Sequence, residues 1–222
     1  MSWKEELLPD ILPDNPLVTA VRWLAEARQA AAAPNPNAMA LATASADGTP
    51  SARIVLCKDI VPEPGYLVFY TNYRSRKGEE LAGNPRAAIV LHWDHAHRQV
   101  RVEGMVAPTS EAENDAYFAT RSRASAIGAW ASEQSQPIAS RRLLEQAVAR
   151  ARAQLDPQGS GEGPIPRPPH WGGYRLWAQA VELWAEGAAR IHDRARWTRQ
   201  LEPGTGSAAF LPGPWRATRL QP

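Results

Sequence analysis

The sequence contains little of what marks several large protein classes. Among its 222 residues there is one cysteine, Cys57, so no disulfide can form within the chain, and we expect a reducing, cytoplasmic setting. No apolar run approaches the roughly 18 residues that a membrane span needs. The N-terminus is acidic and rich in proline, without the basic and apolar regions of a signal peptide.

Nucleic-acid binding is not indicated either, because the formal net charge is only +2. Neither GxGxxG nor GxxxxGK[ST] occurs, so we expect no Rossmann or Walker nucleotide site. Lysine is scarce: the 25 basic residues include Lys4, Lys58 and Lys77, and the others are arginines. Lys58 lies in an apolar strand pattern and Lys77 at a strand-to-helix junction. Chance placement and a specific role explain these two positions equally well.

The hydrophobic residues, 44% of the chain, follow patterns of an α+β fold with a largely antiparallel sheet. Strands come first, helices lie in the middle and strands return at the end, which favours a small β-barrel with flanking helices. We assign residues 1–16 to a flexible arm and 17–222 to a single domain. The expected helices cover residues 16–33, 78–85, 111–121, 123–131 and 140–155. The expected strands cover residues 39–45, 52–58, 66–71, 87–93, 98–106, 173–187, 188–200 and 214–222.

A group of cationic residues follows two of the expected strands. If strands 52–58 and 66–71 pair, Arg53, Lys58, Arg76 and Lys77 converge at one end of the barrel. Arginine and lysine together suit a phosphate dianion, and Ser75 with the first N–H groups of the next helix adds donors. A solvated turn with a few polar residues is the competing interpretation, and spacing does not separate the two.

A second candidate site lies near the C-terminus. Arg190, His192 and Arg194 fall on one face of the expected strand 188–200, because alternate residues of a strand point the same way. Trp184 and Trp197 flank this run and indicate partial burial, which favours an anion-binding or catalytic site over a solvated face.

Histidine is also concentrated in HWDHAH, which contains His92, His95 and His97 at an expected hairpin turn. Metal ligation needs convergent nitrogens, and these side chains would splay apart. We therefore expect no metal site.

Several segments, in this order, resemble the pyridoxine (pyridoxamine) 5′-phosphate oxidase family. The resemblance covers nearly everything after about residue 17. The matching segments are RIVLCK (53–58), FYTNYRSRKGEEL (69–81), RQVRVEG (98–104), YFATRSRASAIGAWASEQS (117–135), HWGGYRL (170–176), ELWAEGAARIHDR (182–194) and WRATRLQP (215–222).

This resemblance implies an FMN-binding split β-barrel that works as a homodimer, with FMN at the subunit interface. It implies that FMN is held by residues of both subunits. The implied cofactor residues are Arg53, Ile54, Val55, Leu56, Cys57, Lys58, Tyr70, Thr71, Ser75, Arg76, Lys77, Gln99, Gln134, Ser135, Trp184 and Arg194.

The resemblance further implies an oxidase that converts pyridoxine or pyridoxamine 5′-phosphate into pyridoxal 5′-phosphate. Oxygen is the electron acceptor, hydrogen peroxide is released, and the amine also yields ammonia. Lys58, Tyr117, Arg121 and Ser125 would hold the substrate. Arg190 and His192 would bind it over its reacting face and act as the catalytic residues.

Two other functions stay open. A related FMN oxidase of secondary metabolism, such as the phenazine-pathway enzymes, shares the strand motifs. Its substrate has no phosphate, so we would expect it to lack part of the Ser-Arg-Lys, Tyr/Arg/Ser or Arg-x-His sets, all of which are intact here. A non-catalytic binder of FMN or pyridoxal phosphate would lack Arg190 or His192.

Overall fold

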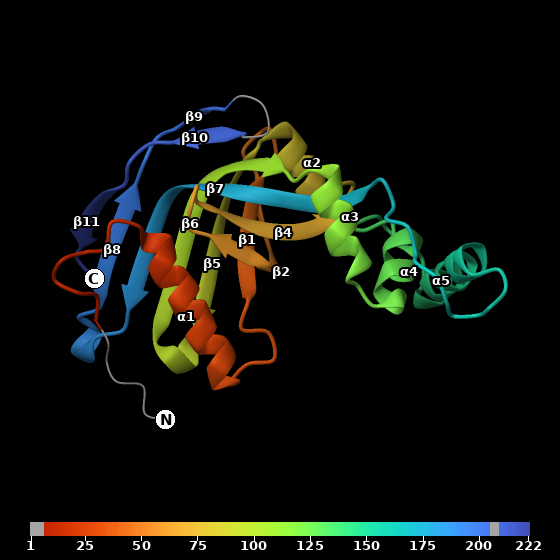
Figure 1. Ribbon diagram of the computed structural model, residues 1–222, viewed down its shortest axis with the longest axis horizontal. Coiled ribbons are helices and arrows are strands. Elements are labelled where there is room, and N and C mark those ends of the chain that lie inside the picture. Colours follow the sequence, from red (N-terminus) through yellow and green to blue (C-terminus); the bar gives the residue numbers. More distant parts are fainter. Residues whose placement is uncertain (1–6, 205–208) are drawn as a thin grey trace.

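The computed structural model of the protein describes residues 7–204 and 209–222, and Figure 1 shows their arrangement. Within these residues a nine-stranded antiparallel sheet curls into a barrel, with strand order β11-β8-β7-β6-β5-β1-β2 and with β4 joining β7 to β3. The predicted α+β class and antiparallel barrel are confirmed. The strands of this sheet are β1 (Ala38–Ala44), β2 (Pro50–Leu56), β3 (Asp59–Val61), β4 (Tyr66–Asn72), β5 (Arg86–Trp93), β6 (Arg98–Pro108), β7 (Trp171–Ala185), β8 (Asp193–Thr198) and β11 (Arg216–Leu220).

Helices flank the barrel, and a small hairpin lies beside it. Strands β9 (Leu201–Pro203) and β10 (Phe210–Pro212) form that hairpin and were not predicted. The α-helices among the described residues are α1 (Pro16–Ala30), α2 (Arg76–Gly83), α3 (Glu111–Ala119), α4 (Arg123–Ala131) and α5 (Arg141–Leu155), and two 3₁₀ turns are η1 (Asp94–Ala96) and η2 (Ala188–Arg190).

The ends of two helices follow from their capping residues. The Asn15 side chain accepts a hydrogen bond from the Leu17 N–H at 3.0 Å, which caps α1 with Pro16 at its first position. Helix α1 ends at Ala30, three residues earlier than expected, because Ala31 takes a left-handed conformation with φ 50°. Ser110 and Glu113 form a capping box, and α3 begins at Glu111, as expected.

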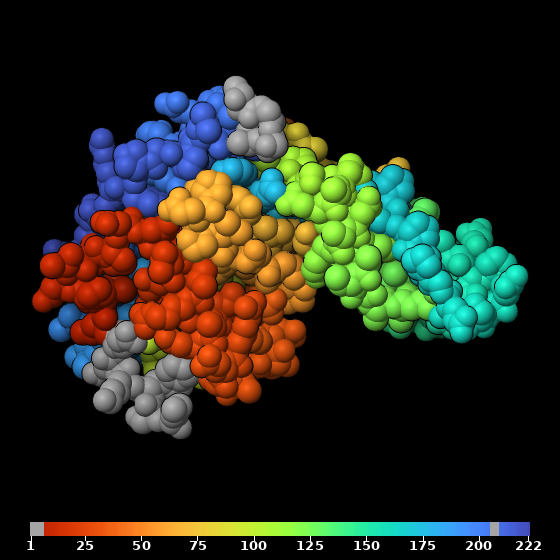
Figure 2. Space-filling view, viewed as in Figure 1, coloured from red at the N-terminus to blue at the C-terminus, as the bar shows by residue number. Residues whose placement is uncertain are grey.

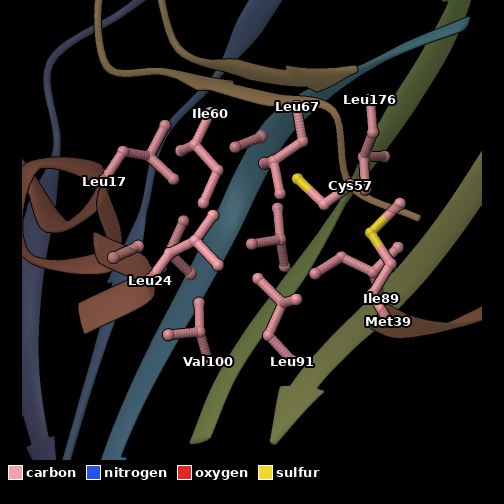
Figure 3. Close-up of a cluster of buried hydrophobic side chains, with 14 of the residues drawn as sticks. Leu17, Leu24, Met39, Cys57, Ile60, Leu67, Ile89, Leu91, Val100 and Leu176 are labelled. Carbon is pink, nitrogen blue, oxygen red and sulfur yellow. The ribbon is translucent and has the colours of Figure 1, made fainter. Parts of the chain in front are cut away.

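The core lies between α1 and the inner face of the barrel. Figure 3 shows Leu17 and Leu24 of α1 among side chains from the strands, including Ile60, Leu91 and Val100. Full burial of one such side chain stabilises the fold by about 1.5–3 kcal/mol. This contact therefore anchors α1 to the barrel.

Helices α4 and α5 extend away from the barrel. Figures 1 and 2 show them, in green and teal, as a projection on one side of the molecule. Ala151 is the buried residue of α5, and α5 packs mainly against α4. The segment between them carries Gln134 and Ser135 back toward the barrel.

Strand β7 is the longest strand and organises the sheet. Its first part, from Trp171 to Trp177, pairs with β4, and its second part, from Ala180 to Ala185, pairs with β8. Strand β6 pairs along nearly its whole length. Because β7 pairs with β4 along its first part and with β8 along its second, the barrel is split between these two parts.

Two sequence-based expectations are not met: the conditional pairing of segments 52–58 and 66–71, and the predicted extent of strand 188–200. Strand β2 ends at Leu56 and pairs with β1, while β4 pairs with the unpredicted β3, so segments 52–58 and 66–71 form no ladder. Lys58 is nevertheless tied to β4, because its N–H donates to the Val68 carbonyl at 2.8 Å.

The second error concerns segment 188–200, because β8 begins only at Asp193. Residues 188–190 form η2, in which Ala189 and Arg190 have left-handed φ values of 53° and 64°. Arg190 and His192 therefore precede the strand and do not share a strand face with Arg194. The chain turns tightly here, and a Cβ on Gly187 would lie 2.0 Å from the Ile191 carbonyl oxygen.

Part of the expected N-terminal arm contacts the barrel. The Leu8 side chain is buried, and its N–H donates to the Asp193 carboxylate at 2.8 Å. The Trp197 indole donates to the Pro13 carbonyl at 2.8 Å, and Arg219 donates to the Pro9 carbonyl at 2.7 Å. Residues 1–6 of the arm lie outside the described residues.

Candidate functional site

Lys77 lies at the start of α2, where β4 ends. Its ammonium group donates to Thr71 Oγ1 at 3.1 Å, to Ser75 Oγ at 3.0 Å and to Gln134 Oε1 at 2.8 Å. The Gln134 contact brings the segment after α4 to the end of β4. The structure thus gathers three other predicted cofactor residues around the Lys77 ammonium group.

The charge of Lys77 is not neutralised by these partners, which are all uncharged. Burial and the nearby Arg53 guanidinium lower the pKa of Lys77 to about 8, against a smaller opposing effect of Glu80. All three donors of the ammonium group are engaged, but none of the acceptors is an anion, so the positive charge of Lys77 still attracts a negatively charged ligand.

Glu80 lies one turn further along α2, and all its contacts come from donors. It accepts from the Thr43 hydroxyl, from Ser51 Oγ at 2.7 and 2.8 Å, from Arg53 Nη2 at 3.2 Å and from Arg76 Nε at 2.9 Å. Burial alone would raise the pKa of Glu80, but these hydrogen bonds lower it to about 2. Glu80 is therefore a carboxylate at every ordinary pH.

Arg53 and Arg76 contact Glu80 in different ways. Arg53 directs both terminal nitrogens into the protein, to the Leu41 carbonyl, Thr43, Ser51 and Glu80. Arg76 holds Glu80 through Nε, its side chain is 60% exposed, and no described residue bonds its terminal nitrogens.

The charges of this cluster fit a phosphate group. Arg53, Arg76 and Lys77 carry three positive charges and Glu80 one negative charge, which leaves a net charge of +2. A phosphate monoester is a dianion above its second pKa of about 6. Charge, the exposed Arg76 nitrogens and the buried Lys77 ammonium therefore all suit the phosphate of FMN.

An aromatic stack lies next to this cluster. The Tyr70 ring is 3.9 Å from the Tyr117 ring and 5.4 Å from the Trp171 ring, each at an angle of 9°. The Lys58 ammonium lies 5.6 Å from the centre of the Tyr117 ring. Burial raises the pKa of Tyr70, so its hydroxyl stays protonated.

Two glycines at the start of β7 leave room for the side chains of Tyr70 and Tyr73. A Cβ on Gly173 would lie 2.8 Å from the Tyr70 ring, and a Cβ on Gly172 would lie 2.1 Å from the Tyr73 hydroxyl. Trp171, just before them, was not predicted as a site residue. Its place in HWGGYRL, before a pair of glycines, is the signal that could have indicated it.

Arg121 joins the stack from the loop after α3. Its guanidinium lies 4.8 Å from the Trp171 ring, and Nη2 donates to the Ser125 carbonyl at 3.1 Å. Its Nε is buried with no hydrogen-bond partner among the described residues. Burial lowers the pKa of Arg121, which still lies far above neutrality as for any arginine. The structure thus brings Lys58, Tyr117, Arg121 and Ser125 together.

A third group lies at the far end of β7. Trp184 packs on His192 with ring centres 4.8 Å apart, and Gln99 is the partner of Trp184 in the β6–β7 ladder. Arg194 donates twice to Glu182, at 3.0 and 2.8 Å. Arg190 is exposed in the adjacent turn.

These groups are not close together within one protomer. Trp171 begins β7 and Ala185 ends it, and a strand of 15 residues extends roughly 45 Å along its path. Figure 1 shows β7 running from the side of α3 toward the turn before β8. The phosphate cluster and the aromatic stack therefore lie near one end, and Trp184, His192 and Arg194 near the other.

The predicted residues of strand 53–58 differ in orientation. The Ile54 side chain is 66% exposed, and those of Val55 and Leu56 are partly buried. Cys57 is fully buried in the core, as Figure 3 shows, and burial raises the pKa of its thiol to about 12. Its side chain therefore faces away from any ligand on the barrel surface. Ser135 is exposed, with a left-handed φ of 75°.

Comparison with known proteins defines the family of this fold and site. Residues 25–155 match the family model described as pyridoxamine 5′-phosphate oxidase. A pyridoxine/pyridoxamine 5′-phosphate oxidase of Cupriavidus taiwanensis is 50% identical over 96% of this chain and 91% of its own length. The chain belongs to the pyridoxamine 5′-phosphate oxidase family. A relative of the same name from Burkholderia vietnamiensis is 49% identical over the same shares.

Other comparisons extend the family assignment to the C-terminal part of the chain and to the fold. Residues 171–222 match the family's C-terminal dimerisation region. The structure of PhzG from Burkholderia lata, in complex with tetrahydrophenazine-1-carboxylic acid, superposes with a TM-score of 0.84 at 33% identity, covering both chains fully. A pyridoxamine 5′-phosphate oxidase-related, FMN-binding protein from Nostoc punctiforme superposes at 0.67 with 18% identity, over 93% of this chain and 97% of its own, which supports the barrel fold.

The described residues contain neither a cluster of metal ligands nor a membrane-spanning helix. No group of three or more histidine, cysteine, aspartate or glutamate side chains in this part of the chain could hold a metal ion. His97 instead pairs with Glu186. No helix in the described ranges has both the length and the apolar character to cross a membrane.

Proposed function

We propose that this family member is an FMN-dependent oxidase that converts pyridoxine or pyridoxamine 5′-phosphate into pyridoxal 5′-phosphate. Oxygen is the acceptor, hydrogen peroxide is released, and the amine also yields ammonia. One observation carries the proposal: cations occur at two places around the aromatic stack of Tyr70, Tyr117 and Trp171. Lys77, next to Arg76, bonds Thr71 beside Tyr70, and Lys58 and Arg121 lie against the Tyr117 and Trp171 rings. A flavin mononucleotide and a phosphorylated substrate need one such group each. The names of the relatives from Cupriavidus and Burkholderia support the same activity.

The cofactor site combines residues from both ends of β7. Arg76 and Lys77 would bind the FMN phosphate, with Ser75 and Thr71 fixing the ammonium group. When bound, FMN would supply the redox chemistry by accepting a hydride from C4′ of the substrate and returning the electrons to oxygen. The remaining proposed contacts are Arg53, Ile54, Val55, Leu56, the backbone of Cys57, Lys58, Tyr70, Gln99, Gln134, Ser135, Trp184 and Arg194.

The substrate site uses the second cationic group. Lys58, Tyr117, Arg121 and Ser125 would hold the substrate phosphate and ring, and the unpartnered Arg121 Nε offers a buried donor for a phosphate oxygen. Arg190 and His192 would act over the reacting face. Arg190 would orient the substrate and stabilise the charge that develops during the reaction, and His192, held against Trp184, would orient the ring.

Completion of this site requires a homodimer with FMN at the interface. Trp184, near the end of β7, and its β8 partner Arg194 lie too far from the start of β7 to reach Lys77 of their own chain. A two-fold related copy would bring them to the partner's phosphate cluster. The match of residues 171–222 to a dimerisation region supports this arrangement, since it includes both side chains.

An FMN oxidase of phenazine metabolism is the second candidate, and the close superposition on PhzG favours it. The Lys58, Tyr117, Arg121 and Ser125 group argues against it, because the ligand in that PhzG structure is a carboxylic acid without phosphate. A non-catalytic flavin or pyridoxal phosphate binder is disfavoured because Arg190 and His192 are both present.

The decisive experiment measures oxygen consumption and peroxide release by FMN-loaded protein. We expect turnover with pyridoxine or pyridoxamine 5′-phosphate and none with unphosphorylated pyridoxine. A reduced phenazine carboxylic acid serves as the competing substrate. Turnover of that acid without turnover of either vitamer phosphate would establish the second candidate, and FMN binding without turnover of any substrate would establish a binder.

A further inference from the structure

Glu80 is a buried carboxylate inside the cluster of cations assigned to the FMN phosphate. Its side chain is 6% exposed, and all its contacts come from hydroxyl or guanidinium donors. A fixed negative charge opposes the binding of a dianion, so its presence needs a physical reason. The contact with Arg76 provides one.

Arg76 is the first residue of α2, and Glu80 follows it by four residues, on the same face of the helix. The contact uses Arg76 Nε at 2.9 Å, so neither terminal nitrogen is engaged by the carboxylate. An exposed arginine otherwise populates many rotamers, and ordering it costs conformational entropy. The Glu80 contact removes much of that cost before any ligand binds.

The sheet holds Glu80 in turn. Thr43 of β1 and Ser51 of β2 both donate to its carboxylate, and Arg53 of β2 donates from the same side. The orientation of Arg76 is thereby fixed by the barrel through a rigid carboxylate, and does not depend on the first turn of α2 alone.

We propose that Glu80 is a positioning residue that holds Arg76 through Nε and so presents its terminal nitrogens to the FMN phosphate. This inference rests on the proposed function, because it assumes that FMN is the ligand. Glu80 touches neither cofactor nor substrate in this account and acts through Arg76.

The substitution Glu80→Gln separates this role from others, because an amide offers one acceptor oxygen where the carboxylate offers two. The buried donors of Thr43 and Arg53 both reach Oε2, so the glutamine oxygen is expected to take that position. Its NH₂ group then faces Arg76 Nε, donor against donor, and Arg76 is released.

The test titrates apoprotein with FMN and, separately, with riboflavin, which lacks the phosphate. We compare wild type, Glu80→Gln, Arg76→Met and the double variant, with Glu79→Gln as the control because Glu79 is an exposed carboxylate on the same helix. We expect Glu80→Gln to weaken FMN binding about tenfold and to leave riboflavin binding unchanged. In the Arg76→Met background the same substitution should cause no further weakening.

Three results would overturn the proposal while leaving the proposed function intact. Tighter FMN binding by Glu80→Gln in both backgrounds would mean that Glu80 acts only through its charge. Equal weakening of FMN and riboflavin would mean a purely structural role. If Glu80→Gln does not fold, Arg76→Lys replaces it: lysine keeps the charge but lacks Nε, and undiminished FMN affinity would refute positioning. Failure of wild type to bind FMN would overturn the proposed function itself.

Discussion

Lys77 combines burial with three uncharged hydrogen-bond partners, and this combination has a measurable consequence. Because its pKa is lowered to about 8, a fraction of the free protein carries a neutral amine at mildly alkaline pH. A bound phosphate dianion stabilises the ammonium form and raises the pKa in the complex. FMN binding above pH 8 must therefore take up a proton, and affinity falls as pH rises from the free pKa toward the bound one.

We predict that the FMN dissociation constant is nearly constant between about pH 6.5 and pH 7.5 and rises up to about tenfold for each pH unit above 8. Quenching of flavin fluorescence measures it. Riboflavin binding should show no such dependence. Lys77→Arg, which cannot deprotonate in this range, should remove the slope. A wild-type slope that survives in Lys77→Arg would assign the titration to another group.

For single residues, the sequence indicated the cationic side chains of the site better than the residues around them. Lys77 was suggested by the scarcity of lysine and its position after a strand, and its contacts agree with a specific role. Glu80 and Trp171 were not predicted. A glutamate in a short helix looks like solvated surface until tertiary structure places Thr43, Ser51 and Arg53 around it.

Among the elements, hairpins and capped helices were predictable because their signals are local. The hairpin of β1 and β2 follows a turn signal, and the capping box of Ser110 and Glu113 begins α3 where expected. Pairing between distant strands carries no such signal, so the ladder of β4 with β7 was not found. The turn before β8 was missed because alternating residues suggested a strand, although Gly187 permits a tight turn.

The turn that follows Gly187 carries Arg190 and His192, and it is tight because Gly187 has no Cβ. In Gly187→Ala, the new Cβ meets the Ile191 carbonyl oxygen at 2.0 Å, and this atom is backbone and cannot rotate away. The turn must open, which displaces both side chains. We expect kcat to fall at least about tenfold, since small misplacements of catalytic groups are costly, and the free energy of unfolding to fall by about 1–3 kcal/mol.

Steady-state peroxide production and thermal unfolding measure these effects. Gly213→Ala is the matched control, because its Cβ has ordinary contacts, 3.6 Å from the Gln200 carbonyl oxygen at the nearest. Arg190→Ala is the reference for full loss of the side chain, and we expect it to lower turnover far more than FMN affinity. Wild-type kcat in Gly187→Ala would show that the turn does not position Arg190.

For the whole molecule, one protomer contains two incomplete halves of the proposed site. The phosphate cluster with Lys77 lies near the start of β7, and Trp184 and Arg194 lie near its end. A two-fold axis that joins the first half of one chain to the second half of another completes two equivalent sites. Each site then depends on both chains, which can be tested by mixing variants.

We predict that Lys77→Met and Arg194→Ala are each nearly inactive alone and regain activity when mixed and allowed to exchange subunits. In the mixed dimer both substitutions fall in one site, and the other site has Lys77 and Arg194 intact. Random exchange makes half of the dimers mixed, so recovery should reach about a quarter of wild-type activity. Peroxide release over time after mixing measures it.

A mixture of Lys77→Met with Arg76→Met is the control and should recover none, because each mixed dimer then carries one defect in each site. No recovery in the mixture of Lys77→Met with Arg194→Ala would place the two halves of each site in a single chain.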